Sequence, residues 1–129
     1  MTSSPRCPCG SGDDYADCCG PLHRGERVAR TAVALMRSRF SAYAVGDADY
    51  VLATWHPATR PADVTLDETI TWRRLQIVDT ERGGDDDHDG VVEFRAQYVD
   101  GGRRHILHER SRFIRTGDRW HYLDGAFPP

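Results

Sequence analysis

The spacing of hydrophobic positions changes partway along the chain. From residue 29 to residue 43, apolar side chains recur every three or four positions, the spacing of one helix face turned toward a core; they are Ala29, Ala32, Met36, Phe40 and Tyr43. Gly46 is expected to end this helix. Asp47 is expected to cap a second, shorter helix that runs through Trp55 and ends where two prolines interrupt it. Two helices are therefore predicted between about residue 29 and residue 55.

From residue 65 onward the pattern is that of β-strands. β-branched and aromatic residues fill four segments separated by turn residues, namely Thr69 to Thr80, Val91 to Val99, His105 to Arg115 and Arg119 to Leu123. The acidic, glycine-containing run from Glu81 to Gly90 is expected to form a solvated hairpin tip. Two helices followed by an antiparallel meander predict an α+β roll, in which the helices cover one face of a curved sheet.

The cysteines predict a metal site. All four lie near the N-terminus, at the two ends of a short loop that contains Gly10 and Gly12, and they are Cys7, Cys9, Cys18 and Cys19. Four soft thiolates on a loop that folds back on itself favour a structural zinc ion with tetrahedral coordination. A segment this small has too little apolar surface to fold alone, so the metal is expected to fold it.

Three alternatives to this ligand set remain at this point. Disulfides fit less well, because neighbouring cysteines are poorly placed for bridging each other. The chain also begins without an apolar export segment, so a cytoplasmic location with reduced thiols is expected. An iron site would use ligands of similar softness. His23 would be the fourth ligand if Cys19 were not.

The motifs resemble a known bacterial family. The run CPCGSGDDYADCC, with GPLHRG after it, resembles the zinc motif first recognised at the C-terminus of the SecA translocation motor, called SEC-C. RSRFSAYA, WHP, HERSRF and RWHYLDG extend the resemblance to the YchJ-like family of uncharacterised proteins. The resemblance implies a zinc knuckle over residues 1–25 and a nuclear transport factor 2-like, cystatin-like α+β domain over residues 26–129. It implies no particular reaction.

The third strand contains a candidate chemical group. Strand alternation places Leu107, Glu109, Ser111 and Phe113 on one face, so that a carboxylate comes to lie among core residues. Such a carboxylate must be paired, hydrogen-bonded or neutralised. Glu109 is therefore the candidate acid or base of a pocket whose other walls are expected to be Tyr43, Trp55, His56, Trp72, Tyr98, Ser111 and Tyr122.

A structural role for Glu109 is the alternative. It would then pair with Arg37 or Arg39 and tie the first helix to the sheet. His108 and Arg110 point to the opposite face, where solvent or the second copy of a homodimer is expected. A histidine adjacent to a glutamate on a strand therefore does not make a catalytic dyad.

Charge and composition narrow the function classes. The chain has 129 residues, 17 basic and 20 acidic, with a net charge of −3, which does not favour a large nucleic-acid footprint. There is no apolar run of membrane-spanning length. No Ser-His-Asp set, phosphate-binding loop or dinucleotide fingerprint is present.

Three hypotheses for the function follow. The first is a non-catalytic module that docks on a protein partner through the zinc knuckle and offers a small-ligand pocket. The second is a small enzyme that uses Glu109. The third is a nucleic-acid or ribosome-associated binder that uses the arginine-rich N-terminal third, which is mildly positive over residues 1–45.

Overall fold

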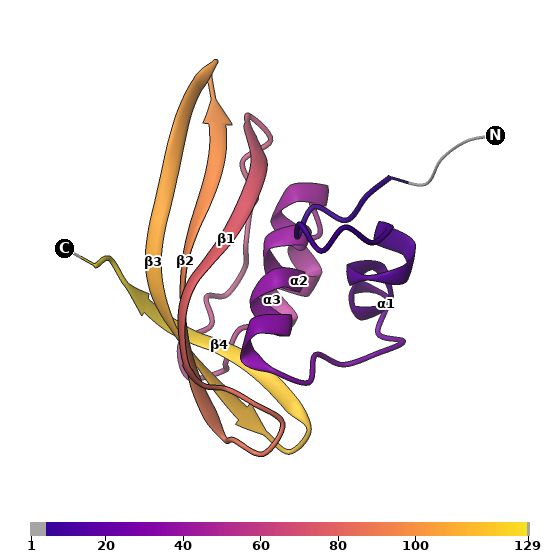
Figure 1. The fold of residues 1–129 in the computed structure, drawn as a ribbon, viewed down its shortest axis with the longest axis vertical. Helices are drawn as coiled ribbons and strands as arrows, with labels where there is room; N and C mark the ends of the chain where they lie inside the picture. Colours follow the sequence, from indigo (N-terminus) through magenta and orange to yellow (C-terminus); the bar gives the residue numbers. More distant parts are fainter. Residues whose placement is uncertain (1–4, 129) are drawn as a thin grey trace.

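The computed structural model describes residues 5–128 and contains short helical elements followed by one sheet (Figure 1). The helical elements are η1 (Tyr15–Asp17), α1 (Cys19–His23), α2 (Ala32–Val45) and α3 (Ala48–Ala53). The strands are β1 (Ile70–Arg82), β2 (Asp89–Asp100), β3 (Arg103–Thr116) and β4 (Arg119–Ala126). The predicted α+β class and the order of helices before strands are confirmed.

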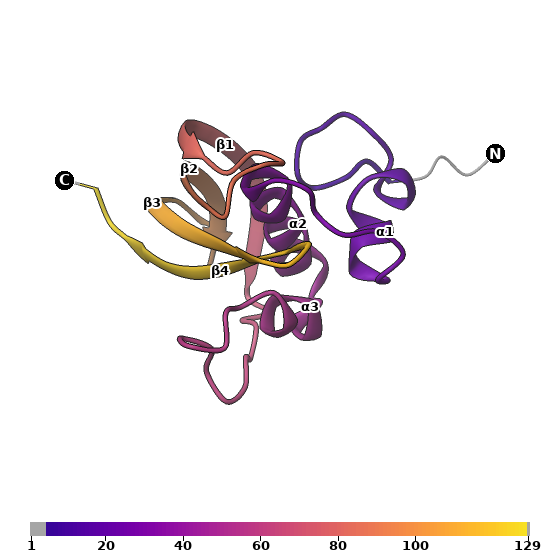
Figure 2. The same ribbon diagram turned by 90° about the horizontal axis from the view of Figure 1, so that it is seen from below.

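The strands form an antiparallel meander in the order β1-β2-β3-β4. The sheet is long and strongly curved, and α2 and α3 lie on one of its faces (Figures 1 and 2). A parallel bridge between Trp55 and Tyr122 covers part of the β4 edge. It is held by hydrogen bonds of 2.8 Å from the Tyr122 amide to the Thr54 carbonyl and from the His56 amide to the Tyr122 carbonyl.

The helix ends follow from local capping. Thr31 precedes α2 and its side-chain oxygen accepts a hydrogen bond of 3.1 Å from the Ala34 amide. Gly46 ends α2 in the left-handed conformation, with φ of 83°, and the Asp47 side chain then caps α3 by accepting from the Tyr50 amide at 3.0 Å. The helix therefore begins at Ala32, three positions later than the hydrophobic spacing alone predicts, because Thr31 is the capping residue.

The main core lies between α2 and the concave face of the sheet. Its buried residues include Leu35 and Phe40 of α2, Val92 and Phe94 of β2, and Phe113 of β3. The strand residues alternate between this core and the outer face, as period-two patterning requires. The predicted core faces of the first helix and the second strand are the ones that pack together.

Most residues from Glu81 to Gly90 are exposed, as expected for a solvated tip, but the two ends of the segment make specific contacts. β1 continues through Arg82 and β2 begins at Asp89, where the two side chains form a bidentate ion pair with distances of 2.9 and 3.0 Å. The Gly83 carbonyl accepts a hydrogen bond of 2.9 Å from the Ala32 amide at the start of α2. This hairpin end is therefore attached to the first turn of α2, which the acidic composition did not indicate.

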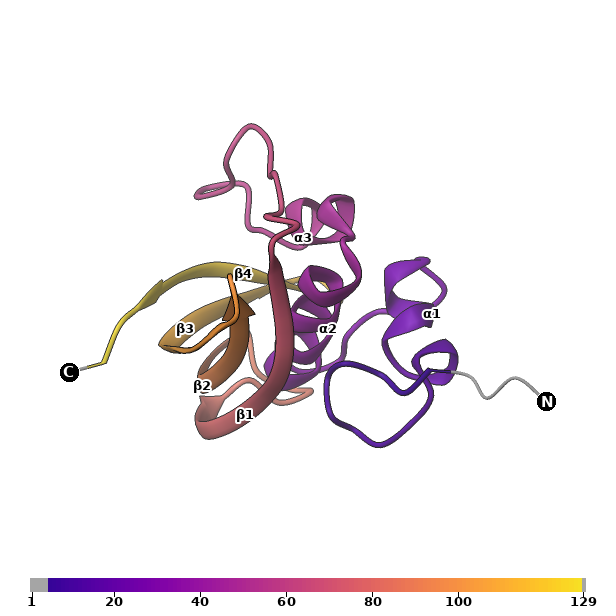
Figure 3. The ribbon, with the colours of Figure 1, turned by 90° about the horizontal axis from the view of Figure 1, so that it is seen from above.

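The N-terminal segment with η1 and α1, here called the head (residues 5–25), packs on the side of α2 away from the sheet (Figure 3). α2 therefore has the head on one side and the sheet on the other. Within residues 5–128, none of the helices combines the length and the apolar character needed to cross a bilayer.

Candidate metal centre and cavity

The four cysteines of the head converge. The sulfur atoms of Cys7, Cys9, Cys18 and Cys19 all lie within 4.8 Å of one another. All four are free thiols, and the Sγ atoms of Cys9 and Cys18 are 3.6 Å apart, well beyond the S–S bond length of about 2.05 Å. Three of the four side chains are buried. This arrangement fits one tetrahedral metal ion with thiolate ligands.

Backbone turns bring the cysteines together. The Cys7 amide donates to the Asp13 carbonyl at 2.8 Å, which closes the loop, and Gly10 and Gly12 take φ values of 84° and 90° inside it. These positive φ values are strained for residues that have a Cβ atom. Cys18 and Cys19 follow directly after η1, so the short helix delivers the second pair to the first.

The thiols form a hydrogen-bonded group. The hydrogen bond from Cys19 lowers the pKa of Cys9 to about 4, and the same bond, with burial, raises the pKa of Cys19. Burial also raises the pKa of Cys18. A cation bound among the four sulfurs would favour the thiolate form of each, because cysteine must be deprotonated to ligate a metal.

His23, the alternative fourth ligand, is engaged elsewhere. Its Nδ1 accepts from the Tyr15 hydroxyl at 2.5 Å, and its Nε2 donates to the backbone carbonyl of Ser38 at 2.8 Å. The ring also packs against Tyr50, with 4.6 Å between centroids. With both ring nitrogens occupied, His23 joins the head to α2 and α3.

Two further contacts join the cysteine cluster to α2. The Arg37 guanidinium donates to the Cys9 carbonyl at 2.9 Å. The Ser41 hydroxyl lies 3.4 Å from the Cys7 sulfur, and both of these side chains are buried. Arg37, Ser38 and Ser41 thus form the surface of α2 on which the head sits.

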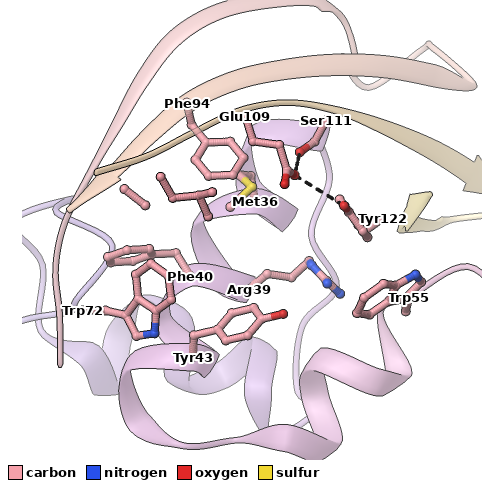
Figure 4. Close-up of a pocket in the computed structure, with 12 residues that line it drawn as sticks. Met36, Arg39, Phe40, Tyr43, Trp55, Trp72, Phe94, Glu109, Ser111 and Tyr122 are labelled. Carbon is pink, nitrogen blue, oxygen red and sulfur yellow. Dashed lines mark hydrogen bonds between the residues drawn. The ribbon is translucent and has the colours of Figure 1, made fainter. Parts of the chain in front are cut away.

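A cavity of about 280 Å³ lies on the other side of α2 (Figure 4). Its wall on the helix side comes from Met36, Arg39, Phe40 and Tyr43, and Trp55 contributes from the segment after α3. Its wall on the sheet side is formed by Trp72, Phe94, Ala96, Leu107, Glu109, Ser111 and Tyr122. Most of this lining is aromatic or aliphatic, and Glu109 and Arg39 carry the charges.

Glu109 extends into the cavity from β3 (Figure 4). Its Oε2 accepts hydrogen bonds from the Ser111 hydroxyl at 2.5 Å and from the Tyr122 hydroxyl at 3.3 Å. Ser111 is fully buried. Burial raises the pKa of Tyr122, and the negative charge of Glu109 raises it further, so this phenol stays protonated and serves as a donor.

The predicted arginine partner of Glu109 is not present within the described residues. No arginine nitrogen comes within 4.0 Å of the carboxylate, since Arg37 is used at Cys9 and Arg39 bonds to other groups. Nη1 of Arg39 donates to the Val51 carbonyl at 2.8 Å and to the Thr54 hydroxyl at 2.7 Å. The prediction that Glu109 forms an ion pair with an arginine of the first helix is therefore wrong.

Arg39 is a buried cation held between aromatic rings. Only 3% of the residue is exposed. Its guanidinium carbon lies 4.7 Å from the ring centroid of Tyr122 and 5.3 Å from that of Trp55, distances typical of cation–π contacts. Burial lowers the pKa of Arg39, and the surrounding phenols and Glu109 act in the opposite direction. A guanidinium remains protonated even so, because its pKa starts far above neutrality.

Two residues expected to form the pocket lie outside the lining. Tyr98 does not line the cavity but packs against the lining residue Trp72 and stacks on His105, with 5.0 Å between centroids in both cases. His56 faces His121 instead, with 6.1 Å between their centroids. Tyr43, Trp55, Trp72, Glu109, Ser111 and Tyr122 all line the cavity.

The sequence interpretation missed Arg39 as part of the lining. The available signal was helical spacing, because Arg39 lies three positions after Met36 and four before Tyr43, on the same face. Its charge made solvent exposure or an ion pair the more obvious expectations. The predicted orientation of His108 is the one found: it lies on the outer face, where its Nε2 is 2.8 Å from a Glu93 carboxylate oxygen.

Comparisons with known proteins match the head and the domain that contains the cavity separately. Residues 31–125 match the family described as "YchJ, middle NTF2-like domain", and residues 6–21 match the SEC-C motif. The chain belongs to the YchJ family. The predicted resemblance is thereby confirmed, while the expected boundary near residue 25 remains a prediction.

Several YchJ-family relatives cover almost the whole chain. A UPF0225 protein of Streptomyces coelicolor is 50% identical over 124 residues, which cover 96% of this chain and 97% of the relative. A UPF0225 protein of Deinococcus radiodurans is 50% identical over 121 residues, which cover 93% and 88% respectively.

Two solved structures share the fold. The solution structure of RPA3114, a SEC-C motif containing protein from Rhodopseudomonas palustris, has a TM-score of 0.83 at 37% identity and covers 95% of this chain and 98% of its own. The crystal structure of a SEC-C motif containing protein from Psychrobacter arcticus has a TM-score of 0.76 at 25% identity and covers 95% and 82%. The YchJ-family chain thus shares its NTF2-like fold with proteins that carry the same cysteine motif.

Proposed function

We propose that this chain is a non-catalytic ligand-binding module, in which the cysteine cluster holds a structural zinc ion and the cavity takes a small organic molecule. The observation that carries the proposal is the cavity between α2 and the sheet, which has apolar walls and a few converging polar groups. This is the usual composition of a small-molecule site.

The donor set supports zinc as the metal. Cys7, Cys9, Cys18 and Cys19 supply four thiolates and leave no open position, which is typical of structural rather than catalytic zinc. When bound, the ion supplies a charged cross-link that stabilises the head. Arg37 and Ser41 then connect that cross-link to α2 through Cys9 and Cys7.

The cavity supports binding more than catalysis. Glu109 is accompanied there by Tyr43 and Tyr122, whose pKa values are raised by burial, and by the permanently charged Arg39. These neighbours do not readily exchange protons near neutral pH. His108, the titratable neighbour in sequence, is on the opposite face of the sheet.

The nucleic-acid hypothesis gains less support, because several arginines of the N-terminal third are already used. Arg39 is buried, Arg37 bonds to the Cys9 carbonyl, and Arg24 pairs with Glu26. A protein partner that docks on the head remains a prediction, as do homodimer formation and a cytoplasmic location.

The proposal is tested by combining metal analysis with a binding measurement. The purified chain should contain about one equivalent of zinc. In isotope-labelled, zinc-loaded protein, the neutral aromatic phenylethanol should shift the NMR signals of the Trp72 indole and of the Ala96 and Leu107 amides in a saturable way. Ala96→Leu, which fills part of the cavity, should weaken these shifts, whereas the exposed Val78→Ala should not. Absence of saturable shifts with phenylethanol and with its charged analogues would contradict the proposal.

A further inference from the structure

The two charged groups of the cavity are each only partly satisfied. Both hydrogen bonds to Glu109 reach Oε2, so Oε1 has no protein donor among residues 5–128. Both strong hydrogen bonds from Arg39 leave Nη1, and among residues 5–128 its other two nitrogens have only the Tyr43 hydroxyl as a hydrogen-bonding neighbour. Arg39 is buried and Glu109 is half-buried. Unused hydrogen-bonding capacity on a buried charged group is costly unless another molecule supplies the partner.

These two groups do not neutralise each other directly. Glu109 comes from β3 and Arg39 from α2, both line the cavity, and no ion pair within 4.0 Å joins them in the described part of the chain. Figure 4 shows the guanidinium and the carboxylate on different sides of the cavity, with the Tyr122 side chain beside both. The cavity therefore presents a cation on one wall and an acceptor on another.

Both groups are fixed before any ligand arrives. Trp55 and Tyr122 hold the Arg39 guanidinium between their rings, and Ser111 and Tyr122 fix the Glu109 carboxylate. Preorganised charges lose little conformational freedom when a ligand binds. They also select against a ligand of the wrong charge, because such a ligand would leave one of them unpaired.

The rest of the wall is apolar. Met36, Phe40, Trp72, Phe94, Ala96 and Leu107 form a continuous aliphatic and aromatic surface next to the charged groups. The cavity volume of about 280 Å³ is just below the range for drug-sized ligands, which begins near 300 Å³. A compact ligand with one apolar group fits these dimensions.

We infer that the cavity binds a small zwitterion with an apolar side chain, of the free α-amino acid class. The ligand carboxylate pairs with Nε and Nη2 of Arg39, its ammonium group donates to Oε1 of Glu109, and its apolar group lies against Phe94 and Leu107. A singly charged ligand satisfies one wall and leaves the other unpaired. This inference rests on the proposed function, since it names the ligand class of the same cavity.

The test compares four related probes by calorimetry on the full-length, zinc-loaded chain. L-phenylalanine carries both charges, phenylpropionate only the anion, phenylethylamine only the cation, and phenylethanol neither. L-phenylalanine should bind at least about tenfold more tightly than each of the other three, because each missing charge removes a charge-assisted hydrogen bond. If phenylethanol or either singly charged probe binds as tightly, the zwitterion inference is overturned while the proposed binding function stands. If none of the four binds, both are overturned.

A charge-neutral variant adds a second readout. Glu109→Gln retains an acceptor for Ser111 and Tyr122 but removes the negative charge, so L-phenylalanine should bind about tenfold more weakly. Phenylpropionate should bind more tightly, because its carboxylate no longer faces Glu109. Glu81→Gln, which removes a charge on the outer face, is the matched control and should leave both affinities unchanged. Unchanged preference in Glu109→Gln would overturn the inference even if L-phenylalanine binds.

Discussion

Gly125 of β4 provides the space that the Glu109 side chain occupies. The two strands are paired, with Ser111 opposite Gly125. A Cβ atom placed on Gly125 would lie 2.6 Å from Cδ of Glu109 and closer still to Oε2. The absence of a side chain at position 125 therefore permits the observed position of the carboxylate, although Gly125 is not part of the cavity lining.

Gly125→Ala should displace Glu109 without unfolding the domain. The added methyl group meets a side chain that can rotate, so we expect a stability loss of about 1 kcal/mol, together with loss of the Ser111 and Tyr122 hydrogen bonds. Thermal melts and NMR shifts of Ser111 would measure the two effects. Gly84→Ala, at a glycine that also lacks a positive φ but whose added Cβ would meet only an ordinary contact of 3.5 Å, controls for the added methyl group. A Gly125→Ala protein with unchanged Ser111 signals would contradict the expectation.

Arg39→Met should destabilise the fold even though it removes a buried charge. The Val51 carbonyl and the Thr54 hydroxyl lose their guanidinium donor, and two aromatic rings lose a cation. We expect a loss of about 1–3 kcal/mol in the free energy of unfolding. Arg60→Met removes an exposed arginine and should change it by less than about 0.5 kcal/mol. Greater stability of Arg39→Met in denaturant titrations would mean that desolvation of the cation outweighs its contacts.

Cys9→Ser should release the metal and weaken the roll without unfolding it. Separate cores would predict an unaffected roll, but the head contacts α2 through Arg37, Ser38 and Ser41. Loss of these few hydrogen bonds should lower the stability of the roll by about 1–3 kcal/mol. Far-ultraviolet circular dichroism melts with metal analysis would show both effects.

Arg37→Ala is the matched control for that experiment. This variant removes one hydrogen bond between the head and α2 but retains all four thiols. Zinc should therefore stay bound, while the roll loses part of the stability that it loses in Cys9→Ser. An unchanged melting midpoint of the roll in Cys9→Ser would show that the head and the roll are energetically independent.

His121 should make the protein less stable in mild acid. Burial and the nearby charges of His56 and Arg119 lower its pKa in the folded state, and its buried Nδ1 has no hydrogen-bond partner within the described chain. The unfolded chain therefore takes up the proton first, near the ordinary histidine pKa of about 6.5. Above this pH His121 is neutral in both states, and the free energy of unfolding is not reduced. As the pH falls below it, the unfolded chain is protonated first and the free energy of unfolding decreases.

His121→Gln should flatten this part of the pH profile. Denaturant midpoints at intervals between about pH 5 and pH 7.5, across the histidine pKa range, would measure the slope. His88→Gln, in the exposed turn between β1 and β2, should retain the wild-type slope. Equal slopes for wild-type and His121→Gln would contradict the assignment.

The pattern of the sequence predicted the elements better than it predicted the cavity. Strand alternation placed Glu109 and Ser111 on the inner face, because one pleated period determines which side a residue takes. Tyr98 satisfies the same alternation but packs against Trp72 and His105 and does not line the cavity. Alternation determines the face on which a strand residue lies, but not which side chains it meets there. Arg39 was missed for a related reason. A buried arginine on an otherwise apolar helix face can be predicted only when the cavity that it lines is known.

α2 lies between the cysteine cluster and the cavity and contacts both. Arg37, Ser38 and Ser41 face the cysteines, and Arg39, Phe40 and Tyr43 face the cavity, so neighbouring side chains of one fourteen-residue helix serve both sites. A helix of this length moves as a stiff rod, and its side chains keep fixed angles to one another. Arg37 and Ser41, which contact the cysteine loop, are each two positions from Arg39, so a rotation of α2 about its own axis would change the thiolate cluster and the direction of the Arg39 guanidinium together.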